Sequence, residues 1–185
     1  MNTNAPNAAE PMGPPMNRPA AAGDVPDFPQ EGIVFKDLMP LIGHAEAFHS
    51  TVEHLADWAR PRSPDVILGA EARGFIFGGA LAYELGCGFV PARKPGKLPW
   101  EKIRATYELE YGSDALEIHA DAFAEGARVI VLDDVLATGG TAQAKVELVE
   151  GLGGEVVGAL FVIELAFLHG RDKLAGTDVH ALIAY

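Results

Sequence analysis

Two adjacent carboxylates and a glycine-rich turn form the stretch of this chain best suited to chemistry. Asp133 and Asp134 follow the apolar residues 129–132, and five small residues come soon after: Ala137, Thr138, Gly139, Gly140 and Thr141. Carboxylate oxygens accept hydrogen bonds from sugar hydroxyls. The backbone N–H groups of a glycine-rich turn that opens a helix can hold a phosphate dianion. The stretch therefore predicts a site for a sugar phosphate.

Two further segments supply cations. Arg73 lies in the sequence Glu-Ala-Arg-Gly, and Arg93, Lys94 and Lys97 flank a Pro-Gly pair. The second group could be a solvated basic turn. Because the chain carries a net charge of −12, we favour the alternative, that these cations bind a second anionic group of the substrate.

The elements that must position these residues follow a strand–helix alternation. Residues 66–70, 89–92, 129–132, 156–163 and 179–185 read as strands, with helices predicted at residues 45–60 and 75–85 and from Thr141 to the Gly153-Gly154 pair. This alternation predicts an α/β fold with a mainly parallel sheet. Ligands of such sheets bind beyond the carboxyl ends of the strands, so residues 71–74, 93–97 and 133–141 are expected on one rim.

A hairpin is predicted between the two groups of strands. Residues 98–104 are expected to form a loop, residues 106–111 alternate like a strand with one wet face, and residues 116–119 are its antiparallel partner. The first 24 residues lack periodicity and are predicted to be a disordered tail, which leaves residues 25–185 as one domain.

Composition narrows the function classes. With 14 basic and 26 acidic residues the chain does not resemble a general nucleic-acid binder. The single cysteine, Cys87, allows no internal disulfide and suits the reducing cytoplasm. No apolar run reaches membrane-spanning length, and no secretory signal is recognisable. No P-loop motif is present, which disfavours a P-loop ATPase.

The turn-rich segment 27–37 contains three consecutive apolar residues, Ile33, Val34 and Phe35. Such residues either fill a core or line a pocket. Composition alone favours the core.

Five blocks of sequence, in order, resemble the type I phosphoribosyltransferases and within them the adenine-specific family. They are the central motif at 129–141, Asp-Phe-Pro with Gly-Ile-Val-Phe-Lys-Asp at 27–37, Glu-Ala-Arg-Gly-Phe-Ile-Phe-Gly at 71–78, Arg-Lys-Pro-Gly-Lys-Leu-Pro at 93–99, and Tyr-Glu-Leu-Glu-Tyr-Gly with Leu-Glu-Ile-His at 107–119. The resemblance implies the type I phosphoribosyltransferase fold, with a small hood and a mobile loop, residues 97–111, over the site.

The resemblance also implies roles for individual residues. Asp133 and Asp134 would hold the ribose hydroxyls, and residues 137–141 the 5′-phosphate. Arg73, Arg93, Lys94 and Lys97 would contact pyrophosphate. Ile33, Val34, Phe35 and Lys36 would form the adenine pocket, which reverses the preference for a core. Family members often carry arginine at the position of Lys36, and lysine lacks the planar fork of a bidentate contact.

The implied reaction joins adenine to the ribose of 5-phosphoribosyl 1-pyrophosphate, giving AMP and pyrophosphate in purine salvage. The family implies Mg²⁺ carried by the pyrophosphate substrate, and a homodimer in which one subunit can supply a cation to the other. Enzymes acting on 6-oxopurines carry an aspartate at the position of Ala137. In this chain the acid/base is expected instead on the closing loop, at Glu110.

Two alternatives stay open at the level of sequence. The chain could be a regulator that kept the fold and senses nucleotides or 5-phosphoribosyl 1-pyrophosphate. It could also transfer the phosphoribosyl group to a different purine, although Ala137 argues against 6-oxopurines.

Overall fold

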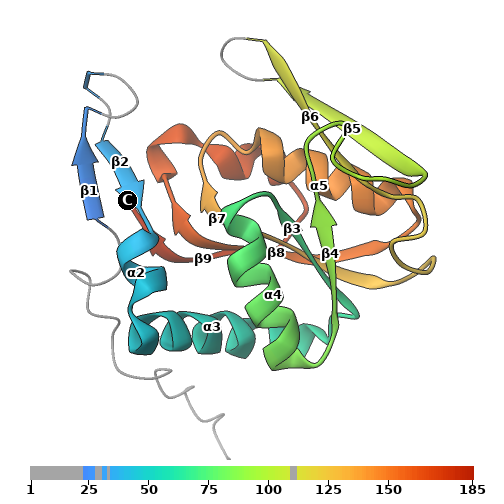
Figure 1. The fold of residues 1–185 in the computed structure, drawn as a ribbon, viewed down its shortest axis with the longest axis horizontal. Helices are drawn as coiled ribbons and strands as arrows, with labels where there is room; N and C mark the ends of the chain where they lie inside the picture. The colour runs from blue at the N-terminus through green and yellow to red at the C-terminus, as the bar shows by residue number, and fades with distance from the viewer. Residues whose placement is uncertain (1–22, 28–30, 33, 109–111) are drawn as a thin grey trace, which may run out of the picture. The chain divides into compact units, whose positions relative to one another are not determined.

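A five-stranded parallel sheet carries the strand ends on which the sequence places the site. The computed structural model describes residues 23–27, 31–32, 34–108 and 112–185, and the chain divides into two compact units, Met1–Ser50 and Thr51–Tyr185. The sheet lies in the second unit and has the order β4-β3-β7-β8-β9 (Figure 1). Its strands are β3 (Val66–Ala70), β4 (Gly88–Ala92), β7 (Arg128–Leu136), β8 (Glu155–Glu164) and β9 (Val179–Ala184). The predicted α/β fold with a mainly parallel sheet is confirmed.

One face of the sheet packs against helix α5 (Gly140–Gly151) and an antiparallel hairpin of β5 (Lys102–Glu108) and β6 (Ser113–His119). Leu68 and Val131 of the sheet share a buried cluster with Leu148 of α5 and Ile118 of β6. Because successive strand residues alternate between faces, the neighbours Ile67 and Ile130 are buried on the other side.

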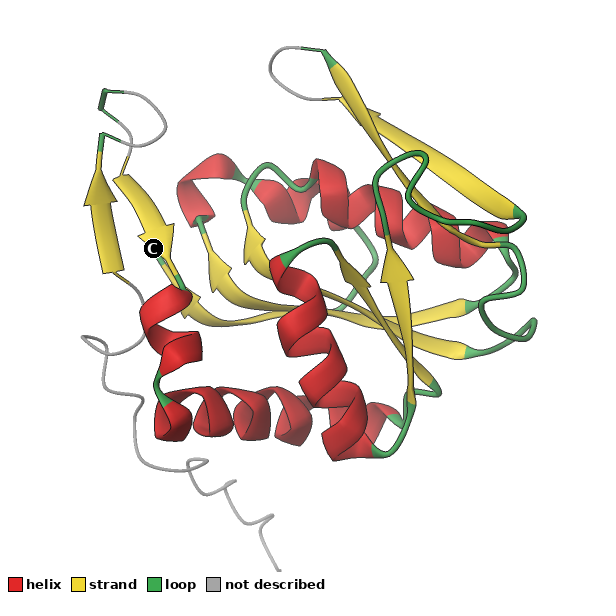
Figure 2. Ribbon diagram, viewed as in Figure 1, coloured by secondary structure: helices red, strands yellow, loops and turns green. Residues whose placement is uncertain are grey.

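Helix α4 (Arg73–Leu85) packs closely against β3 and β4. The close approach depends on glycines. A Cβ atom added at Gly69 or Gly78 would lie 3.0 or 2.6 Å from Cε2 of Phe89, so the ring is confined from both sides. Helix α3 (Ala45–Ala59) begins in the first unit and ends in the second, where Trp58 would lie 2.4 Å from a Cβ at Gly158 of β8. Figure 2 shows helices on both faces of the sheet.

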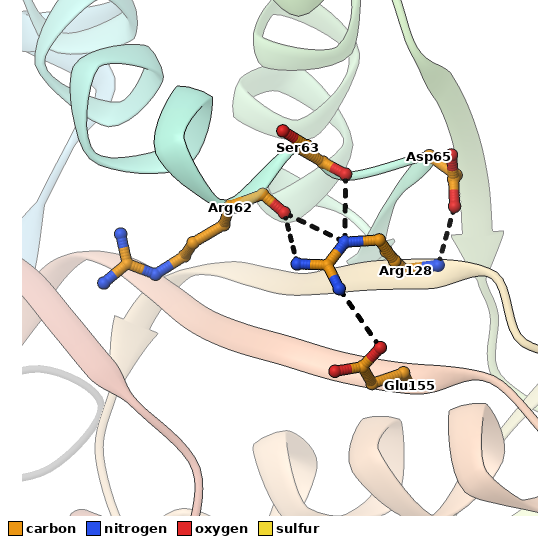
Figure 3. A network of polar contacts seen from close by, with 5 residues as sticks. All are labelled: Arg62, Ser63, Asp65, Arg128 and Glu155. Atoms are coloured by element: carbon orange, nitrogen blue, oxygen red, sulfur yellow. Dashed lines mark hydrogen bonds and ion pairs between the residues drawn. The ribbon is translucent and has the colours of Figure 1, made fainter.

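The amino end of the sheet is tied together by Arg128, the first residue of β7. Its guanidinium donates to the carbonyl oxygen of Arg62 at 2.8 Å and pairs with Glu155 at 3.2 Å, while its backbone N–H donates to Asp65 at 2.8 Å (Figure 3). These contacts link the starts of β7 and β8 with the segment entering β3. They fix the strands at the end of the sheet opposite the carboxyl ends.

The first unit contains β1 (Gly23–Pro26) paired antiparallel with β2 (Val34–Asp37), helix α2 (Met39–Gly43) and the start of α3. Composition favoured a core for residues 33–35, and this is wrong for Val34, which is 51% exposed. Consecutive strand residues face opposite sides, so a run of apolar residues on one strand cannot all be buried on one face. Ile33 lies outside the described residues.

Three predicted boundaries differ from the structure. Helix α4 begins at Arg73 rather than at residue 75. Residues 98–104 are not entirely loop, because β5 begins at Lys102, which pairs with His119 of β6. Strand β7 continues past residue 132 to Leu136, because its ladder with β8 continues as far as the pair Leu136–Glu164.

The remaining described elements are the short 3₁₀ helices η1 (Arg60–Arg62), η2 (Ala166–Leu168) and η3 (Gly170–Leu174). Across the described parts of the chain, each helix is too short or too polar to span a membrane.

Two neighbouring glycines of α4 provide a test of this packing. Gly78→Ala would force its methyl group against the confined Phe89 ring and is expected to lower the free energy of unfolding by about 1–3 kcal/mol. Gly79→Ala meets no atom within 4 Å and should raise it by about 0.5–1 kcal/mol, because alanine favours a helix interior. Urea denaturation of both variants measures the difference. Equal effects would contradict the packing of α4 on β4.

Candidate active site

The register of the sheet brings three predicted segments to one edge. The ladder between β3 and β4 ends at the pair Ala70–Ala92, and that between β3 and β7 ends at Gly69–Leu132. Residues 71 and 93 therefore follow at the same level, and Asp133 lies within one residue of it. The chain proceeds from β3 to β4 on one side and later places β7 on the other, so the switch point of the sheet lies between β3 and β7.

A pocket of about 310 Å³ opens at this switch point. It brings together residues of all three predicted segments and of the β5–β6 hairpin. The lining residues are Ala70, Glu71, Ala72, Arg73, Lys94, Tyr107, Leu116, Asp133, Asp134, Val135, Leu136, Ala137, Thr138, Gly139, Gly140, Thr141, Ala142 and Phe161. The expectation of a single rim shared by the three segments is confirmed.

The two carboxylates at the floor of the pocket each have a cation. Nζ of Lys145 lies 2.9 Å from Oδ2 of Asp133, and Nε of Arg73 lies 2.7 Å from Oδ2 of Asp134. The second contact is an ion pair rather than an aligned hydrogen bond, because that Oδ2 atom is buried without a hydrogen-bond donor. The backbone N–H of Asp134 donates to Oδ1 of Asp133 at 3.1 Å.

Burial dominates the ionisation of Asp134. Desolvation and the like charge of Asp133 raise the pKa of Asp134 to about 6, although Arg73 and Lys145 act in the opposite direction. A carboxyl with a pKa this high changes its charge within the range in which most enzymes are assayed.

Lys145 was missed by the sequence analysis. It lies on α5, is fully buried, and also donates to the carbonyl oxygen of Leu132 at 2.7 Å. Helical spacing could have identified it, since Lys145 lies three residues before Leu148 and four before Val149, both in the apolar core. A lysine on the core face of a helix requires a buried acceptor.

The segment after β3 meets the basic turn after β4 through Glu71. Its carboxylate pairs with Arg93 at 3.1 Å and accepts a hydrogen bond from the backbone N–H of Lys94. Burial would raise the pKa of Glu71, but these two contacts lower it overall. The peptide bond that follows Glu71 is cis.

The predicted cations occupy different positions. Arg73 and Lys94 line the pocket, and Nζ of Lys94 pairs with Asp114 of β6 at 3.0 Å, which raises the pKa of Lys94 and lowers that of Asp114. Arg93 lies behind them, with Nη1 at 3.4 Å from the carbonyl oxygen of Lys97. Arg93 and Lys97 are not lining residues of the pocket.

The glycine-rich turn is held by a close backbone contact. Gly139 has φ +81°, and a Cβ atom there would lie 2.3 Å from the carbonyl oxygen of Gly170. A Cβ at Gly170 would lie 2.2 Å from the carbonyl oxygen of Ala137. Neither position accommodates a side chain, so the turn can approach η3 only as glycine.

Tyr107 of the hairpin covers the start of α5. Its Cδ2 atom would lie 3.2 Å from a Cβ at Gly140, and its hydroxyl group hydrogen-bonds with the Thr141 side chain. Burial raises the pKa of Tyr107 despite that hydrogen bond. Tyrosine at this point gives the pocket an apolar wall beside the backbone N–H groups of the helix start.

The remaining predicted site residues belong to other parts of the chain. Val34, Phe35 and Lys36 are on β2 of the Met1–Ser50 unit, so their contribution to a base pocket stays a prediction. Glu110 and Ile33 lie outside the described residues.

Removal of the Asp134 charge tests whether that buried charge lowers the free energy of unfolding. Because the folded-state pKa is raised from 3.8 to about 6, the folded chain holds a proton that the unfolded chain has lost, and stability falls as pH rises between about 4 and 6. Asp134→Asn is therefore expected to be more stable than the parent at pH 8, by on the order of 2 kcal/mol, and not at pH 4. Denaturant titrations at both pH values measure this. Asp172→Asn, at an exposed position, is the control, and a gain independent of pH would contradict the assignment.

Comparison with known proteins agrees with this architecture. The phosphoribosyl transferase domain model matches residues 42–181. The adenine phosphoribosyltransferase of Thermotoga maritima is 52% identical over 88% of this chain and 94% of its own length. That of Thermoanaerobacter pseudethanolicus is 55% identical, with the same coverage of both chains.

Solved structures give the same result. The crystal structure of the Thermoanaerobacter pseudethanolicus adenine phosphoribosyltransferase has a TM-score of 0.87 and 54% identity, covering 89% of this chain and 96% of that one. The Saccharomyces cerevisiae enzyme, complexed with an imino-altritol bisphosphate and adenine, has a TM-score of 0.83 and 46% identity, with coverage of 88% and 94%. With its sheet, its pocket and these similarities together, the chain belongs to the adenine phosphoribosyltransferase family of type I phosphoribosyltransferases.

Proposed function

We propose that the pocket transfers the phosphoribosyl group of 5-phosphoribosyl 1-pyrophosphate to adenine, forming AMP and pyrophosphate for purine salvage. The observation that carries this is the meeting of a carboxylate pair, a glycine-rich helix start and two cations in one pocket of a chain that belongs to this family. A related structure from Trypanosoma brucei, with a TM-score of 0.81 and 26% identity, is a complex with AMP, pyrophosphate and ribose-5-phosphate. Its coverage is 89% of this chain and 76% of that one.

The sugar phosphate fits the two elements at the end of β7. Asp133 and Asp134 would accept hydrogen bonds from the ribose hydroxyls. The N–H groups of Ala137, Thr138, Gly139, Gly140 and Thr141, at the positive end of α5, would hold the 5′-phosphate. Because only Ala137–Gly139 separate the end of β7 from the start of α5, the two recognition sites are held at a nearly fixed separation.

The pyrophosphate would be bound by the cations on the neighbouring strand ends. Arg73 and Lys94 line the pocket, and Arg93 pairs with the lining residue Glu71 and contacts the carbonyl oxygen of Lys97. When N9 of adenine bonds to C1′, the bond from C1′ to the pyrophosphate oxygen breaks and its electron pair leaves with pyrophosphate. Cations on the leaving group lower this barrier.

Mg²⁺ would enter bound to the pyrophosphate group of the substrate. Within the described residues, no cluster of three or more His, Cys, Asp or Glu side chains could hold a metal ion, and Asp133 and Asp134 are already paired with Lys145 and Arg73. This arrangement suits a metal ion held by substrate oxygens. When bound, Mg²⁺ supplies further neutralisation of the leaving group.

The base would be held by Ile33, Val34, Phe35 and Lys36, with Phe35 stacking on the adenine ring. The support is the resemblance of this segment to the family. Since Ala137 supplies no carboxylate, Glu110 would exchange a proton with a purine nitrogen during attack. Closure of residues 97–111 over the substrates would exclude water, which could otherwise hydrolyse the activated sugar.

We also infer a homodimer in the cytoplasm. The family pattern, in which a partner subunit can supply a cation to the pyrophosphate, supports the dimer. Ile76 and Tyr83 of α4 are 39% and 90% exposed, which is apolar surface suited to an interface. The single cysteine supports a reducing compartment.

A panel of bases tests the reaction. Release of pyrophosphate from 5-phosphoribosyl 1-pyrophosphate is expected with adenine and not with hypoxanthine, guanine or xanthine. EDTA should abolish release, and excess Mg²⁺ should restore it. Release with none of the four bases would favour a regulator that senses nucleotides, and release with hypoxanthine would contradict the role of Ala137.

Substitution of Glu110 tests the acid/base assignment. Glu110→Ala is expected to lower kcat with adenine by roughly 10²- to 10⁴-fold at saturating substrates, because general acid–base catalysis contributes that much. Glu108→Ala, at an exposed position two residues earlier in the chain, is the matched control and should keep kcat. Wild-type kcat in Glu110→Ala would show that the proton is handled elsewhere.

A further inference from the structure

Lys145 is a buried cation that pairs with Asp133 of the pocket without lining the pocket itself, and it has no assigned role in the reaction. Its side chain is fully buried, and its ammonium donates to Asp133 at 2.9 Å and to the Leu132 carbonyl oxygen at 2.7 Å. Nζ also lies 5.9 Å from the centre of the Phe161 ring. An ammonium in such a place is stable only while its acceptors stay in place.

The two cations of the acidic pair differ in their freedom to leave. Arg73 is the first residue of α4 and its side chain is 32% exposed, so it can turn toward a substrate anion. Lys145 is fully buried and does not line the pocket, so its ammonium stays with Asp133 and Leu132. The Asp133 pair is therefore fixed, whereas the Asp134 pair is exchangeable.

Lys145 also joins the two halves of the sugar-phosphate site. It belongs to α5, whose first residues form the phosphate-binding turn, and its hydrogen bonds end on residues 132 and 133 of β7. The β3–β7 ladder ends at Leu132, and the ammonium donates to the carbonyl at that end. A single side chain thus holds the helix start at a set distance from the carboxylates.

We propose that Lys145 is a positioning residue for the phosphoribosyl substrate, which holds Asp133 in a permanent ion pair and leaves Asp134 as the carboxylate that exchanges its cation for ribose hydroxyls. The exchange proceeds as follows. Pyrophosphate draws Arg73 away from Asp134, and the ribose hydroxyls then donate to the oxygen that Arg73 has left. Asp133 keeps its cation throughout and supports Asp134 through the hydrogen bond from the Asp134 N–H to Asp133 Oδ1.

The inference rests on the proposed function, so the first measurement is binding without turnover. Lys145→Met keeps the length of the side chain and removes the charge. It is expected to weaken binding of ribose 5-phosphate, measured by calorimetry at pH 8, by roughly tenfold or more. The KM for 5-phosphoribosyl 1-pyrophosphate should rise likewise, with the KM for adenine unchanged. Glu147→Gln, an exposed position on the same helix, is the control.

A pH profile separates positioning from a purely structural role. The groups that face Asp134 are Asp133, Arg73 and Lys145, and loss of the Lys145 cation raises the pKa of Asp134. The acid limb of kcat/KM for 5-phosphoribosyl 1-pyrophosphate should therefore move to higher pH in Lys145→Met. The substrate phosphate itself titrates near pH 6, so the difference between variants is the readout. Unchanged binding and an unmoved acid limb would overturn the proposal.

A double variant keeps the test decisive if Lys145→Met does not fold. Asp133→Asn/Lys145→Met removes both charges of the fixed pair together, and it should bind ribose 5-phosphate more tightly than Asp134→Asn does. The reverse order would show that Asp133 is the main ribose ligand and overturn the division of roles. The affinities of the parent and its variants for ribose 5-phosphate could follow the expected order while the parent forms no AMP. That result would contradict the proposed reaction and still support the role of Lys145.

Discussion

Two neighbouring carboxylates at a buried sheet edge impose the constraint on which the rest of the site depends. Placed side by side in a low-dielectric environment they repel each other, and burial penalises both charges. Each carboxylate forms an ion pair with a cation from a different helix: Asp133 with Lys145 of α5, and Asp134 with Arg73 of α4. The helices that cover the two faces of the sheet are thus also the source of its charge balance. The raised pKa of Asp134 is the part of the penalty that this balance leaves uncompensated.

The sheet register converts this local balance into a pocket. Because β3 lies between β4 and β7 and its ladders with both end within one residue of each other, the residues beyond these ladders converge without long loops. Arg73 is then close enough to Asp134 to form an ion pair, and it lines the pocket. In the proposed reaction, substrate would replace the Arg73–Asp134 ion pair, while the Lys145–Asp133 pair would stay in place.

Much of this could be predicted from sequence, for identifiable reasons. Strands such as 66–70 are short apolar runs between turns, and their parallel order follows from the intervening helices, so the rim shared by Arg73, Lys94 and Asp134 was accessible from pattern alone. The extension of β7 beyond Leu132 could not be predicted in this way. It depends on pairing with β8, and the paired residues, such as Leu136 and Glu164, lie far apart in the sequence. Lys145 was overlooked because a single charged residue on an apolar helix face becomes meaningful only when its buried acceptor is known.

The contact between Gly139 and Gly170 makes the segment after β8 a structural support for the turn. Gly170 begins η3, and Arg171 beside it forms a two-pronged pair with Glu164, at 2.6 and 2.7 Å, at the end of β8. The turn that would hold the phosphate thus packs against the backbone of η3, which is held in place by an ion pair to β8. A side chain at Gly170, which lies outside the phosphate-binding turn, would therefore displace that turn as surely as a side chain at Gly139 would.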